Sequence, residues 1–68
     1  MKHEFTLTIE YRSKLDGLLY LQFDADKHQP NSKVELYCHD DPLGRHDRSV
    51  TESDLKENYT KLREYLED

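Results

Sequence analysis

One short segment of the chain concentrates the side chains that can do chemistry. The stretch CHDDPLGRHD, residues 38–47, holds one cysteine, two histidines and three aspartates. Thiolate, imidazole and carboxylate groups bind zinc in proteins, and they also act as nucleophiles, bases and acids in hydrolases. Two hypotheses follow for this segment: a metal site, and a small metal-dependent hydrolase centred on His39, Asp41, His46 and Asp47.

The positions of these residues argue against both hypotheses. Cys38 and His39 are consecutive at the end of an expected strand, so their side chains should point to opposite faces of the sheet. Cys38 continues the apolar register of Val34 and Leu36, which predicts a buried thiol that acts as a small hydrophobic residue. Asp41 opens the type I turn DPLG and can hydrogen-bond its own turn backbone. We therefore expect no catalytic residue, no metal ligand and no cofactor here.

The elements that carry this segment begin with a hairpin. Apolar and polar residues alternate through HEFTLTIEYR, residues 3–12, which predicts a strand. Asp16 and Gly17 then supply turn chemistry for a tight hairpin into LLYLQF, residues 18–23. The side chains expected to point inward from the second strand are those of Leu19, Leu21 and Phe23. Alternation returns in VELYCH, residues 34–39, which predicts the third strand.

The C-terminal segment has the pattern of an amphipathic helix. Thr51 is a suitable N-cap, with Asp54 three residues later, and the helix should begin near Glu52. A stripe of apolar residues at helical spacing follows, formed by Leu55, Tyr59, Leu62 and Leu66. The expected fold is α+β: a single domain over residues 1–68, with a three-stranded antiparallel β-meander and one C-terminal α-helix packed on one face (βββα).

Composition restricts the classes of partner. Fifteen acidic and ten basic residues give a formal net charge of -5, which disfavours direct contact with nucleic acid or an anionic membrane. A protein partner with a basic surface is the expectation. The sequence shows neither an apolar run long enough to span a membrane nor the apolar core of a signal peptide, so a cytoplasmic location is expected.

Two surfaces are candidates for binding such a partner. The first is acidic and comprises Asp40, Asp41, Asp47, Glu57, Glu64 and Glu67. The second is the sheet face opposite the helix, where Tyr20 and Tyr37 are expected as cross-strand neighbours, because tyrosine is enriched in interfaces. The two open edges of a three-stranded sheet are also compatible with a homodimer.

The sequence is therefore compatible with three functions. The leading hypothesis is a non-catalytic acidic protein that binds and regulates or inhibits a larger macromolecule, with mimicry of nucleic-acid charge as one form of it. The second is a nucleic-acid-binding module that reads through its three-stranded sheet. The third is the small metal-dependent hydrolase of the His39 to Asp47 loop.

Overall fold

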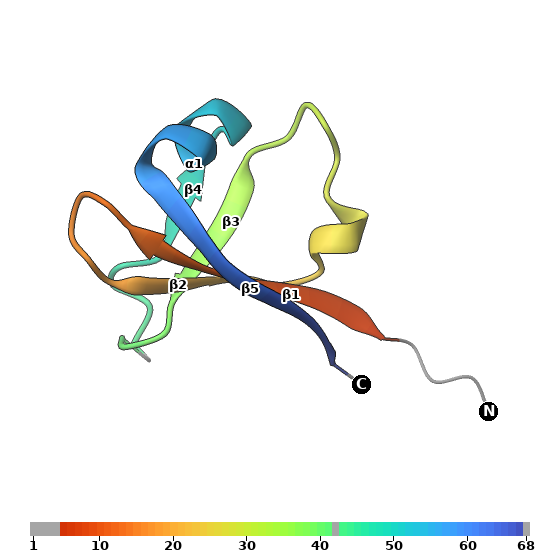
Figure 1. Ribbon diagram of the computed structural model, residues 1–68, viewed down its shortest axis with the longest axis horizontal. Helices are drawn as coiled ribbons and strands as arrows, with labels where there is room; N and C mark the ends of the chain where they lie inside the picture. The colour runs from red at the N-terminus through yellow and green to blue at the C-terminus, as the bar shows by residue number, and fades with distance from the viewer. Residues whose placement is uncertain (1–4, 42, 68) are drawn as a thin grey trace.

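The computed structural model describes residues 5–41 and 43–67 of the chain, apart from the side chain of residue 67 (Figure 1). In chain order the elements are β1 (Thr6–Ser13), β2 (Leu19–Gln22), the 3₁₀ turn η1 (Ala25–Lys27), β3 (Val34–Cys38), β4 (Arg48–Val50), α1 (Glu52–Asn58) and β5 (Tyr59–Glu67). The strands form a five-stranded sheet in the order β4-β3-β2-β1-β5. Each pair of neighbours is antiparallel.

The expected βββα arrangement is wrong, because the described residues contain a five-stranded sheet and are mostly β. Two strands were missed. β4 has only three residues, of which two are polar and exposed, so it carries almost no periodic signal. β5 lies in the segment that was expected to be helical, and in Figure 1 it runs along β1 from the end of α1.

The helix at the C-terminal end is much shorter than its apolar stripe suggested. Its start is confirmed: the Thr51 side chain accepts a hydrogen bond from the backbone N–H of Asp54 at 3.1 Å. The helix ends at Asn58, whose side chain donates to Asp54 and whose carbonyl accepts from Lys14 N at 2.8 Å. Pairing the following residues with β1 satisfies a row of backbone groups that a three-stranded sheet would leave open at its edge.

The β1–β2 hairpin has the predicted turn, but the side chains of its second strand point to the opposite sides from those expected. Gly17 adopts a φ of 72°, which is the positive φ that the turn requires. Tyr11 pairs with Tyr20, and both rings are buried in the core, whereas Phe23 is exposed. The inward residues of β2 are therefore Tyr20 and Gln22, not the expected Leu19, Leu21 and Phe23.

The hydrophobic core lies on the inner face of the curled sheet and is closed on one side by α1. β3 supplies the predicted inward set, since Val34, Leu36 and Cys38 are all buried. The remaining buried hydrophobic residues are Tyr11, Tyr20, Val50 and Tyr59, with Ile9, Leu18 and Leu55 packed against them. The described residues contain no helix with the length and hydropathy that crossing a membrane demands.

Candidate functional site

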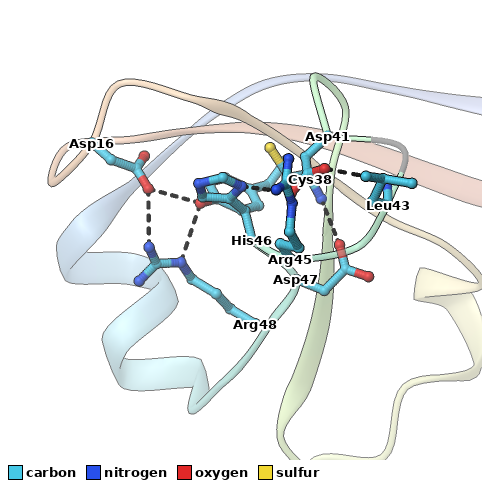
Figure 2. Close-up of polar contacts among 9 residues, drawn as sticks. Asp16, Cys38, Asp41, Leu43, Arg45, His46, Asp47 and Arg48 are labelled. Atoms are coloured by element: carbon cyan, nitrogen blue, oxygen red, sulfur yellow. Dashed lines mark hydrogen bonds and ion pairs between the residues drawn. The ribbon is translucent and has the colours of Figure 1, made fainter.

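The segment between β3 and β4 folds around the carboxylate of Asp41 (Figure 2). Asp41 Oδ1 accepts a hydrogen bond from Leu43 N at 3.2 Å, which is the predicted bond to its own turn. Asp41 Oδ2 lies 2.7 Å from His46 Nδ1 and 3.8 Å from Arg45 Nε. The Asp41 side chain is buried while both partners are exposed, so this carboxylate holds the loop together and does not present free charge to a partner.

Asp47 closes the other end of the loop. Its Oδ1 accepts a hydrogen bond from the backbone N–H of Cys38 at 3.1 Å, as Figure 2 shows. The free thiol of Cys38 belongs to the core and the residue is 6% exposed. Asp47 therefore acts on the backbone of the third strand, which sequence reasoning did not anticipate because the two residues are nine positions apart.

A second polar network joins the β1–β2 hairpin to β4, about 30 residues further along the chain. The Tyr20 hydroxyl donates to Asp16 Oδ2 at 2.7 Å, and Arg48 Nε donates to the Tyr20 oxygen at 3.1 Å. Arg48 Nη2 also donates to Asp16 Oδ2 at 3.1 Å. Burial, together with the hydrogen bond to Asp16, raises the pKa of Tyr20 to about 12, so the hydroxyl stays protonated as a donor at physiological pH.

The chemistry available in this region is mainly structural. His46 and Asp41 form an imidazole–carboxylate pair, the arrangement that orients a general base in hydrolases. The hydroxyl of Tyr20 and the carboxylates of Asp41 and Asp47 are each bonded within the fold. Among residues 5–41 and 43–67, no three His, Cys, Asp or Glu side chains gather in a group able to hold a metal ion.

The Asp41 pair predicts an acid-sensitive contribution to stability. The hydrogen bond with His46 holds the pKa of Asp41 below its ordinary value of 3.8, with a smaller effect from Leu43 N–H. A carboxyl group whose pKa is lower in the folded state than in the unfolded state stabilises the fold. This stabilisation is complete above the pKa of the unfolded state and is lost as the pH falls through the pKa of the folded state.

As the pH is lowered below about 4, we expect the urea concentration at the unfolding midpoint of the wild type to decrease. The decrease should be smaller in Asp41→Asn. Asn keeps an oxygen for the Leu43 N–H but carries no charge. Asp40→Asn is the matched control, because Asp40 is exposed in the same loop. If the urea midpoint decreased equally with pH in the wild type and in Asp41→Asn, the prediction would be contradicted.

The acidic residues chosen from the sequence lie on separate elements. Asp40 is exposed after β3, and Glu57 is exposed on α1. Glu64 is exposed on β5, where its Oε2 accepts from Lys61 Nζ at 2.7 Å. Glu67 is the last residue of β5, and its side chain lies outside the described part of the structure. Of this set, Asp40 and Glu57 keep an exposed carboxylate with no protein partner among the described residues.

The two tyrosines proposed from the sequence do not share a face. Tyr20 is 0% exposed in the core, because its pairing with Tyr11 and Cys38 turns it to the inner side of the sheet. Tyr37 is 44% exposed on the opposite side, where its strand partner is Leu21. The expected cross-strand pair is therefore wrong, since the register places Tyr20 beside Cys38.

A different aromatic pair occupies the outward side of the sheet. The rings of Phe23 and Tyr37 lie 5.5 Å apart between centroids, and Phe23 is 46% exposed. Leu21 and Leu19 lie on the same side of β2 and are half-buried. We call this region, Leu19, Leu21, Phe23 and Tyr37, the outer face. The outer face was not predicted, because the apolar residues of β2 were expected in the core.

Charged groups border the outer face. Glu10 lies beside Leu21 in the register, is buried, and accepts a hydrogen bond from Arg63 Nε at 2.6 Å. Glu35 lies two residues before Tyr37 on the same side of β3, is exposed, and accepts from the Ser49 hydroxyl at 3.0 Å. The face thus has an apolar centre and a polar margin.

Comparison with known proteins found no matching family model, no matching curated protein and no matching solved structure.

Proposed function

We propose that this protein is a non-catalytic binding protein that regulates or inhibits a larger protein partner, and that the contact is centred on the outer face. The observation that carries the proposal is the pair Phe23 and Tyr37, whose rings touch each other and are both nearly half exposed. A chain of 68 residues has few large apolar side chains, so leaving two aromatic rings together at the surface needs an explanation.

The arrangement resembles the centre of a protein–protein interface in chemical terms. Aromatic residues are enriched there and supply most of the binding energy when the partner covers them completely. Tyr37 lies on β3 and Phe23 directly follows the last residue of β2, so the sheet positions both rings before binding and little flexibility is lost. The half-buried Leu19 and Leu21 extend the apolar centre along β2.

Charge favours a basic protein over a nucleic acid as the partner. The chain carries a net charge of -5, which repels phosphate backbones and attracts basic surfaces over several ångströms. Glu35 and Asp40 are exposed on and just beyond β3, and both add negative charge close to Tyr37. Aromatic rings on a sheet can also stack on bases, so the experiment must separate the two kinds of partner.

The test is capture of the partner from the native host, with substitutions that separate the outer face from the rest of the surface. We expect the double variant Phe23→Ala/Tyr37→Ala to lose a specific protein that the wild type retains. Leu15→Ala is the matched control, because Leu15 is 68% exposed in the β1–β2 turn, outside the outer face. Glu35→Lys should weaken capture, and added salt should weaken it further.

Circular dichroism of each variant checks that the fold is retained. Equal capture by wild type and the double variant would overturn the proposal, as would loss of capture in Leu15→Ala to the same degree. Recovery of nucleic acid as the retained species, removed by nuclease together with the signal, would favour the nucleic-acid-binding alternative. A homodimer that buries the outer face would appear as self-association in sedimentation equilibrium and would also overturn the proposal.

A further inference from the structure

A cavity of about 400 Å³ opens on the other side of the sheet from the outer face. Its lining residues come from the inner face of the sheet, from α1 and from His28 in the segment between β2 and β3. Figure 1 shows α1 on one side of the upper end of β3 and the segment between β2 and β3 on the other side. The volume falls in the range of pockets that bind small molecules.

The walls of the cavity are largely aromatic and aliphatic. The buried residues Tyr11 and Tyr59 line it from β1 and β5, and Val34 and Leu55 line it from β3 and α1. These four side chains belong to the core or pack against it, so they hold the cavity in a fixed shape. Walls of this kind accommodate a flat apolar group, such as an aromatic ring.

The polar groups in the cavity are mostly donors. The Tyr11 hydroxyl donates to Gln22 Oε1 at 3.3 Å, and among the described residues the Gln22 amide nitrogen has no acceptor. Gln22 is only 7% exposed and is one of the residues that line the cavity. Lys56 and Lys61 add two ammonium groups from α1 and β5.

The acceptors do not balance these donors. Glu52 is the single carboxylate that lines the cavity, and its Oε1 lies 3.0 Å from His28 Nε2. Lys61 shares its charge with Glu64, but that carboxylate does not line the cavity. Counted with Glu64, the two lysines are balanced by two glutamates, but Lys56 has no carboxylate partner among the described residues. That unpaired ammonium group matches a ligand carrying one negative charge.

We propose that this cavity binds a small aromatic monocarboxylate, with the ring between the Tyr11, Leu55 and Tyr59 side chains and the carboxylate facing Lys56, Lys61 and the Gln22 amide. The proposal is independent of the outer face, because the two regions lie on opposite sides of the sheet. A dianionic phosphate fits less well, since it would face the Glu52 carboxylate with a charge that the lining does not balance.

The test uses 2-naphthoate as the probe and 2-naphthamide as its neutral counterpart of nearly equal shape. In titrations of the ¹⁵N-labelled protein, 2-naphthoate should give saturable shifts centred on Gln22, Leu55 and Tyr59. We expect 2-naphthamide to bind about tenfold more weakly, because it lacks the charge that the two lysines recognise. The double variant Lys56→Gln/Lys61→Gln should bring 2-naphthoate down to the affinity of 2-naphthamide.

The matched control is Lys27→Gln/Lys33→Gln, which removes the same two charges outside the cavity lining. This control should bind 2-naphthoate within about twofold of the wild type, because neither lysine lines the cavity and exposed charge pairs contribute little in water. Four results would overturn the proposal: no saturable shift at millimolar probe, equal affinity for the acid and the amide, shifts centred on other residues, or equal losses in the two double variants.

Discussion

Replacing Tyr20 with alanine should lower the free energy of unfolding by about 3–5 kcal/mol, which is the usual cost of removing a large buried side chain. Tyr20 is 0% exposed, and its ring meets that of Tyr59 edge to face with centroids 5.8 Å apart. A chain of this length has a total stability of only about 3–10 kcal/mol. Tyr20→Ala should therefore lose about a third or more of the total stability.

Two further variants distinguish the contribution of the Tyr20 ring from that of its hydroxyl, and the contribution of a core tyrosine from that of a surface tyrosine. Tyr20→Phe keeps the ring but removes the hydroxyl that Asp16 and Arg48 contact, and should cost about 1–2 kcal/mol. Tyr37→Ala removes a ring that is 44% exposed, and should cost less than about 1 kcal/mol. Urea denaturation followed by circular dichroism measures the free energy of unfolding of all three variants. A larger loss in Tyr37→Ala than in Tyr20→Ala would contradict the buried position of Tyr20.

The contrast between these two tyrosines shows where sequence reasoning stopped. The segment LLYLQF offers two faces, one with Leu19, Leu21 and Phe23 and the other with Tyr20 and Gln22. Hydrophobicity favours burial of the first face, yet the structure buries the second. Burial of a tyrosine depends on a partner for its hydroxyl. Here one of those partners is Arg48, which is 28 residues away in the sequence, so no local pattern could reveal it.

Local signals were reliable wherever the structure depends on near neighbours. The alternation of β3, the glycine turn and the Thr51 cap all involve contacts within a few residues, and all are present as predicted. β1 is a strand as predicted, but Thr8 and Glu10 are buried although the alternation placed them on the open face. The turn role of Asp41 belongs to the same class. Its pairing with His46 and the bond from Cys38 N to Asp47 depend on how the whole loop closes. The fold class failed for the corresponding reason, because β5 exists only through its pairing with β1.

The C-terminal strand yields the second large expected effect. Tyr59→Ala should lower the free energy of unfolding by about 3–5 kcal/mol, whereas Leu62→Ala should lower it by less than about 1 kcal/mol. Tyr59 is 5% exposed and packs on Tyr20, but Leu62 is 46% exposed. Leu62 is the extra residue where the register shifts, since Tyr11 pairs with Lys61 and Glu10 pairs with Arg63.

This pair of variants distinguishes β5 from the helix that the apolar spacing suggested. In a helix, Leu55, Tyr59 and Leu62 would share one stripe against the core, and both substitutions would remove buried contacts of similar size. In the strand, the bulge separates Leu62 from the alternation that brings Tyr59 inward, so only Tyr59 contributes to the core. Leu66→Ala extends the test, because Leu66 is 65% exposed and should also tolerate truncation. Losses above 2 kcal/mol in both leucine variants would support the helical stripe and contradict the pairing of β5 with β1.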